Sequence, residues 1–215
     1  MQKGLALLLG LLAAVPAMAQ TADTVTVGTV SLASAGSTVD VPVFIRDVSG
    51  TPLGLDQPPG SRIQSYSLTV NYAPASAVQS VTFTRAGITA PLTPAFESSP
   101  SAPGTISLLD VFQESTNLIP FTLNGAPPGN QVGVLHLTIA PTATVGTTIA
   151  LTLDPTLTQL ANQAGTTSET TTNGSLTLVN GAIVVTTPVP ALSAWALALL
   201  AMVLAAVAVV VLPRT

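Results

Sequence analysis

The side chains that could carry out catalysis or bind a transition metal are few in this sequence of 215 residues. His136 is the single histidine, and there is no cysteine. A metal site built from thiolates or from several imidazoles is therefore excluded, because either one needs more of these ligands. The Gly-x-Ser-x-Gly turn that presents a nucleophilic serine is absent, as are the glycine loops that bind nucleotide phosphates. We expect His136 to be structural and the protein not to be an enzyme.

Two carboxylates, Asp110 and Glu114, stand four positions apart near the expected end of a strand. Together with loop carbonyls such a pair could bind Ca²⁺, since this ion prefers oxygen ligands. The closely spaced ligands of an EF-hand are missing, which favours two solvated carboxylates. We therefore expect no cofactor, with Ca²⁺ at this pair as the alternative. A hydrolase with two paired carboxylates is a further alternative, although no motif supports it.

The charge balance argues against nucleic acid as a partner. All nine acidic residues lie between positions 20 and 187, where three arginines are the only basic residues. Three positive charges against nine negative ones give this segment a net charge of −6. A nucleic-acid-binding domain needs a basic surface, so we expect no such partner.

The N-terminal end of the chain has the organisation of a secretory signal. Residues 1–19 combine Lys3, an apolar stretch over 5–15 and the small residues Ala17 and Ala19 around Met18. This order predicts a signal peptide that is cleaved after Ala19. An N-terminal membrane anchor is the alternative, but the apolar stretch is short for a span.

The C-terminal end is long and apolar enough to cross a membrane. Residues 195–212 are 18 consecutive apolar residues. As a helix they would rise about 27 Å, close to the thickness of the hydrocarbon core of a bilayer. Arg214 follows them, as the rule of positive charge on the cytoplasmic side predicts. We expect a transmembrane helix over 195–212 and a domain outside the cytoplasm.

Between these ends the sequence alternates and shows no helical period. Apolar residues occupy every second position over 39–45, 66–72 and 135–139, and the row over 145–153 follows the same alternation with Thr147 as its one polar member. A period of two is typical of a strand with one buried face. Pro42, on the polar side of the first row, predicts a sheet edge or a bulge. With several shorter candidates the count is about nine strands, which predicts an all-β sandwich or jelly roll.

Turn and loop signals separate these rows. Asn180-Gly181 stands between the apolar runs 176–179 and 182–185, which predicts a hairpin. The segments 49–61 and 166–173 are predicted to be polar loops. No repeat and no second domain is evident, so we expect one domain over 20–187.

The order of these segments resembles the cohesin family, whose β-sandwich modules bind dockerins. The stretches that carry the resemblance are 25–48, 63–87, 133–153 and 173–185. It implies a cohesin-like jelly-roll sandwich of about nine strands and a dockerin-like protein partner. In the family, outward positions of the third strand contact the partner. The matching face here consists of Ser65, Ser67, Thr69 and Asn71.

The last 28 residues, 188–215, resemble the C-terminal sorting signal called IPTL-CTERM, which is of the exosortase type. In that signal a short motif precedes a transmembrane helix and a basic end. The motif residues present here are Pro190, Leu192, Ser193 and Trp195. The resemblance implies recognition by a sorting protease. A plain single-pass anchor, with Trp195 at the membrane interface, is the alternative.

These features favour a non-catalytic binding module that is displayed at the cell envelope and takes part in protein adhesion or scaffolding. A carbohydrate-binding module that localises polysaccharide is the alternative, because the same sandwich superfamily contains such modules. Glycan sites usually need exposed aromatic side chains, and the two tyrosines, Tyr66 and Tyr72, fall in a row predicted to be buried. An envelope hydrolase is the third possibility.

Overall fold

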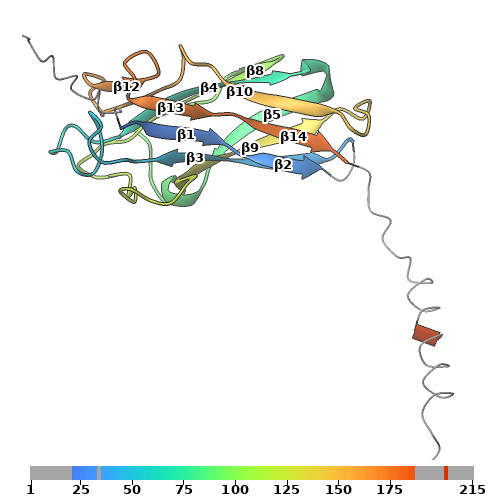
Figure 1. Ribbon diagram of the computed structural model, residues 1–215, viewed down its shortest axis with the longest axis horizontal. Coiled ribbons are helices and arrows are strands. Elements are labelled where there is room, and N and C mark those ends of the chain that lie inside the picture. Colours follow the sequence, from blue (N-terminus) through green and yellow to red (C-terminus); the bar gives the residue numbers. More distant parts are fainter. Residues whose placement is uncertain (1–20, 33–34, 187–200, 203–215) are drawn as a thin grey trace, which may run out of the picture.

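The computed structural model describes residues 21–32, 35–186 and 201–202 (Figure 1). The predicted signal peptide, the four sorting-motif residues and Arg214 lie outside the described residues. Of the predicted span 195–212, only Ala201 and Met202 are described, and they are helical. Within the described part of the chain, no helix is both long and apolar enough to cross a bilayer.

The described residues form an all-β domain with two single-turn 3₁₀ helices, η1 (Ala75–Ala77) and η2 (Gly87–Thr89). The strands are β1 (Asp23–Val27), β2 (Thr29–Leu32), β3 (Thr38–Arg46), β4 (Ser65–Ala73), β5 (Val78–Arg85), β6 (Phe96–Ser98), β7 (Ser101–Ala102), β8 (Thr105–Val111), β9 (Asn130–Ile139), β10 (Thr148–Leu153), β11 (Gln159–Ala161), β12 (Ser168–Thr170), β13 (Leu176–Val179) and β14 (Gly181–Val185). The number exceeds the predicted nine because β6, β7, β11 and β12 are pieces of two or three residues, too short to show a period.

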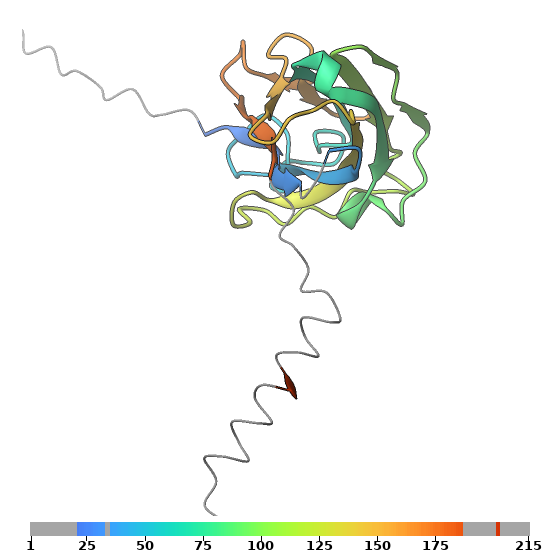
Figure 2. The same ribbon diagram turned by 90° about the vertical axis from the view of Figure 1, so that its right-hand side faces the viewer.

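The strands form two sheets that enclose one core (Figure 2). One sheet has the order β13-β1-β3-β9-β5. The other has the order β12-β11-β4-β10-β14-β2, and β8 pairs with β4 and carries β6 and β7 at its far edge. This two-layer arrangement confirms the predicted all-β sandwich.

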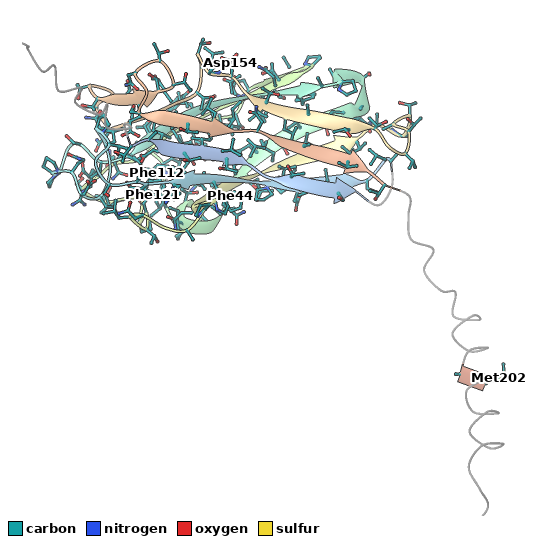
Figure 3. All side chains as sticks on the ribbon, in the orientation of Figure 1. Phe44, Phe112, Phe121, Asp154 and Met202 are labelled. Atoms are coloured by element: carbon teal, nitrogen blue, oxygen red, sulfur yellow. The ribbon has the colours of Figure 1, made fainter. Side chains whose placement is uncertain are left out.

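The predicted alternation sets which side chains enter the core. In β10 every second residue is buried, and in β1 burial alternates in the same way. Both sheets contribute aliphatic side chains with almost no exposure: Val25, Val41, Ile45, Leu68, Leu108, Leu135, Leu151 and Ile183. Phe112 and Phe121 are buried as well, and Figure 3 labels both toward the end of the domain where β1 begins.

Pro42 does not mark a sheet edge, because β3 lies between β1 and β9. The bulge half of the prediction is confirmed next to it, since the pairing of β3 with β9 shifts between Val43 and Phe44. Pro42 also accepts a hydrogen bond from Gly28 through its carbonyl, at 2.8 Å. Strand β3 therefore continues through Pro42, although proline has no amide hydrogen to donate.

The predicted hairpin at Asn180-Gly181 is wrong. β13 pairs in parallel with β1 in one sheet, whereas β14 pairs with β10 and β2 in the other. The chain crosses between the sheets here, and it makes the same crossing at Gly28, between β1 and β2. Figure 1 shows β13 and β14 continuing along one line beside β1 and β2. A Cβ on Gly181 would overlap the Gly28 carbonyl oxygen. Glycine is therefore needed here for the close approach of the two backbone crossings.

Candidate functional site

The predicted partner face of β4 is only partly exposed. Asn71 is exposed and Ser67 is half-buried. Ser65 and Thr69 are buried, so the prediction of a continuous exposed row is wrong at these two positions. Thr69 hydrogen-bonds Ser107 of β8 through their hydroxyls, at 3.0 Å, and lies beneath the segment that follows β10.

A hollow of about 330 Å³ opens on this face of the domain. Its floor is formed by β4 and β8, and its rim by β6 and the loop after β10. Two of its lining side chains are large, apolar and more than half exposed, namely Phe96 at 52% and Leu157 at 55%. The complete lining is Ser67, Thr69, Phe96, Ser98, Pro100, Ser107, Leu108, Leu109 and Leu157. We call this surface the hollowed face.

Leu157 is held in its exposed position by a turn that Asp154 organises. The Asp154 carboxylate accepts hydrogen bonds from the Thr156 hydroxyl, at 2.8 Å, and from the Leu157 amide, at 3.1 Å. Hydrogen bonds from Thr156 lower the pKa of Asp154, so the carboxylate stays charged. Ser67 donates from below to the Leu157 carbonyl, at 3.3 Å. Figure 3 shows Asp154 at the outer surface of the domain.

Phe96 is held on the opposite rim by pairing of β6 with β8, where it faces Val111. The neighbouring residue Glu97 accepts a hydrogen bond from Arg85, at 3.1 Å. Arg85 in turn donates to the Thr89 carbonyl, at 3.0 Å. Both apolar rim residues thus stand on supported backbone, which is what a pre-formed contact surface requires.

The two Ca²⁺ candidates do not converge. Asp110 is buried and accepts a hydrogen bond from the Tyr66 hydroxyl. Glu114 accepts from the Gly60 amide, at 2.9 Å, and its carboxylate lies 3.8 Å from Arg62. The two side chains therefore have different partners. Calcium at this pair stays an untested prediction without geometric support.

Asp110 gives the domain a pH-dependent stability. Burial raises the pKa of Asp110 to about 6. The folded protein binds this proton more tightly than the unfolded chain, so the stabilisation is complete below about pH 4 and is lost as the pH rises through about 6. Between pH 4 and 7 the difference in unfolding free energy between wild type and Asp110→Asn should change by about 2 kcal/mol, favouring wild type in acid. Denaturant titrations at several pH values measure this, and parallel curves would contradict it.

His136 lies in a line of polar groups across the other sheet. Its Nδ1 is 2.6 Å from an Asp40 carboxylate oxygen, and its Nε2 is 2.7 Å from the Thr84 hydroxyl. The order hydroxyl, imidazole, carboxylate resembles that of a hydrolytic triad. The three residues stand on the outer faces of β3, β9 and β5, and the Asp40 side chain is 67% exposed. We interpret the line as a cross-strand ladder that stabilises the sheet.

The exposed aromatic row that a glycan platform needs is not seen among residues 21–32, 35–186 and 201–202. Tyr66 and Tyr72 are buried, as predicted from the alternation. Phe96 is the one exposed aromatic side chain in this part of the chain. Sequence reasoning missed Phe96 and Leu157, because both lie in short irregular segments without a period.

The domain is similar in structure to cohesin modules. CaCohA2 in its complex with a CaDoc0917 variant shows 26% identity and a TM-score of 0.53, and the match covers 76% of this chain and 99% of that one. The solution structure of CaCohA2 from Clostridium acetobutylicum shows 23% identity and a TM-score of 0.52, over 80% and 95%. The third cohesin of ScaC from Acetivibrio cellulolyticus, solved with the ScaB dockerin, shows 18% identity and a TM-score of 0.55, over 76% and 99%. No curated protein matches the chain significantly.

The tail matches a known motif. Residues 187–214 match the family described as the IPTL-CTERM motif. This match confirms the resemblance of the tail, and the structural likeness confirms the cohesin-like sandwich.

Proposed function

We propose that residues 20–187 form an exported, non-catalytic module that binds a protein partner through the hollowed face. The observation that carries this proposal is the pair Phe96 and Leu157, two exposed apolar side chains that flank a hollow, one on strand β6 and one in the hydrogen-bonded turn after β10. Protein interfaces are centred on such apolar anchors, and a polar rim surrounds them. Ser67 and Asn71, from the predicted partner face, would contribute to that rim.

The kind of partner is proposed from the similar structures. CaCohA2 was solved with CaDoc0917 and the ScaC cohesin with the ScaB dockerin, which supports a dockerin-like protein as the partner of this module. Because the domain is negatively charged, a partner with basic residues around an apolar centre would fit it best. Binding requires no chemistry at the hollowed face, in keeping with the absence of a nucleophile motif from the sequence.

The place of action is proposed from the two ends of the chain. The signal peptide 1–19 directs export, and the helix 195–212 holds the protein in the membrane with the domain outside the cytoplasm. A sorting protease then recognises the motif between Pro190 and Trp195 and transfers or releases the domain at the cell surface. The match of residues 187–214 to the IPTL-CTERM motif supports this sequence of events.

Processing of the tail can be tested in the host. Trp195→Ala removes the largest side chain of the motif, so we expect a longer chain that stays in the membrane fraction. Ala191→Gly, at a position where the chain departs from the motif, is the control and should be processed normally. The mass of the mature chain and its distribution between fractions are the measurements. Equal processing of both variants would contradict a role of the motif and favour a plain anchor.

A further inference from the structure

Four carboxylates gather at the end of the domain where β1 begins. Asp23 starts β1, Asp47 follows β3, Asp56 lies in the loop after it, and Glu169 belongs to β12. We call them the acid cluster. The side chains of Asp23, Asp47 and Glu169 are completely buried. In Figure 1 this end lies opposite the one where the chain leaves the domain after β14.

Each buried carboxylate uses one oxygen to hold the loop that follows β3. Asp23 accepts from the Val48 amide at 2.7 Å, and Glu169 accepts from the Leu53 amide at 2.8 Å. Asp47 accepts from the Leu55 amide at 3.0 Å. The other oxygens, Asp23 Oδ2, Glu169 Oε2 and Asp47 Oδ1, are buried without a hydrogen-bond partner. Buried polar atoms are rarely left unsatisfied, so these three oxygens require an explanation.

The free oxygens face other oxygens. The carboxyl groups of Asp23 and Glu169 lie within hydrogen-bonding reach of each other, and the Thr51 hydroxyl adjoins Glu169. That hydroxyl lies 2.6 Å from the Leu53 carbonyl oxygen and 3.0 Å from the Val48 carbonyl oxygen. The surroundings of the buried pair Asp23 and Glu169 therefore consist of carboxylate, hydroxyl and carbonyl groups.

Asp47 and Asp56 both lie close to Gly54, and the charge of Asp47 acts on Asp23 and Glu169. A Cβ on Gly54 would lie 2.5 Å from Asp47 Oδ1 and 3.1 Å from Asp56 Oδ1. Asp56 uses its other oxygen to accept from the Gly50 amide, at 2.9 Å. Glycine thus lets the loop bring two more carboxylates close to the buried pair.

No basic side chain within residues 21–32, 35–186 and 201–202 forms an ion pair with the acid cluster. The ion pairs of this part of the chain join Arg62, Arg85 and His136 to other acids. Arg46, one residue before Asp47, donates instead to the Gly125 carbonyl, at 2.7 Å. Burying charges without a counter-charge is strongly unfavourable, so the cluster needs either bound protons or a cation.

We propose that the acid cluster binds one hard divalent cation of the Ca²⁺ type between the carboxylates of Asp23 and Glu169. The oxygen-only surroundings suit Ca²⁺, which takes six to eight carboxylate, carbonyl and hydroxyl or water ligands. No three His, Cys, Asp or Glu side chains in the described part of the chain form a metal site by themselves. Thr51 and the loop carbonyls therefore complete the set, while Asp47 and Asp56 add negative charge.

A proton shared between Asp23 and Glu169 is the competing explanation. Burial and the facing Glu169 raise the pKa of Asp23 to about 9, so the pair holds a proton when no cation is present. A shared proton would pair Asp23 Oδ2 with Glu169 Oε2 but would not offset the charges of Asp47 and Asp56, whereas a divalent cation would do both. The cation accounts for more of the cluster.

The proposal is tested by Ca²⁺ binding to the full chain from residue 20, purified in mild detergent and stripped with EDTA. We expect equilibrium dialysis with ⁴⁵Ca²⁺ at pH 7.5 to give one saturable ion per chain, and Ca²⁺ to raise the thermal midpoint. Glu169→Gln keeps the shape of the side chain and the acceptor for Leu53 but removes the charge, and it should weaken binding at least tenfold. Glu97→Gln, outside the cluster, is the matched control and should bind like wild type.

Two results would overturn the proposal. One is the absence of bound Ca²⁺ in the stripped wild-type chain, which needs no variant and so does not depend on a variant folding. The other is equal binding by wild type and Glu169→Gln, which would place any bound ion elsewhere. Asp23→Asn distinguishes the explanations further, because it should weaken Ca²⁺ binding if a cation is bound. If a proton is shared, it should instead stabilise the chain at pH 7.5 without Ca²⁺.

Discussion

Leu157→Asp is expected to weaken binding of the protein partner at least 100-fold. Leu157 is 55% exposed on the rim of the hollow, and its side chain would be covered by the partner in the proposed complex. An aspartate there loses the apolar contact and must bury a charge that no residue of the rim compensates. A loss of about 100-fold corresponds to about 3 kcal/mol of binding free energy. Phe96→Asp, on the opposite rim, should act in the same direction.

The control for this prediction is Val145→Asp. Val145 is exposed to a similar degree, 58%, but lies in the loop before β10 and outside the lining of the hollow. Wild type and the three variants can be immobilised at equal density and exposed to the host's secreted and envelope proteins, with capture quantified by mass spectrometry. A protein that binds wild type and Val145→Asp but neither rim variant supports the hollowed face. Equal capture by all of these chains would mean that partners bind elsewhere.

Gly181→Ala is expected to destabilise the domain by about 3 kcal/mol. The new Cβ would overlap the Gly28 carbonyl oxygen and lie 2.6 Å from the Val27 carbonyl oxygen. Both atoms belong to the backbone, so relief requires one of the two sheet crossings to move. Pairing of β14 with β2, whose register begins at Ala182, would be weakened first.

Gly146→Ala provides the comparison. Gly146 has a φ of +88°, and a Cβ there would meet nothing within 4 Å. Only the preference of alanine for a negative φ opposes this substitution, which should lower the free energy of unfolding by about 1 kcal/mol. Urea titrations of the two variants separate steric contact from backbone strain. If Gly181→Ala were no less stable than Gly146→Ala, close packing of the crossings would not be the reason for glycine at position 181.

Local alternation was sufficient to predict the sandwich because a half-buried strand leaves a period of two in its own sequence. The rows over 41–45 and 135–139 are buried on the predicted side, and Val39 is half-buried. Pro42 and Asn180-Gly181 were misread for a common reason. Their local preferences do not reveal which sheet the next strand joins, and this depends on contacts with distant segments such as Gly28.

The candidate sites were harder to predict because the fold assembles them from distant segments. Phe96 and Leu157 are 61 positions apart in the sequence, and only the fold places both of them on the lining of one hollow. Glu169 was placed in a polar loop, yet it forms part of β12 and is buried beside Asp23. The acids are dispersed along the chain, so their spacing carries no signal for the acid cluster. Ser65 and Thr69 lie on the predicted face but are covered by neighbouring segments.

Site-specific crosslinking in the host tests the central claim most directly. A photoreactive amino acid replaces Leu157 in the full chain, or Val145 in a control chain, and intact cells are illuminated. We predict one discrete protein adduct at position 157 and none at position 145. Adducts at both positions in equal amounts, or none at 157 while the domain is displayed, would contradict partner binding at the hollowed face.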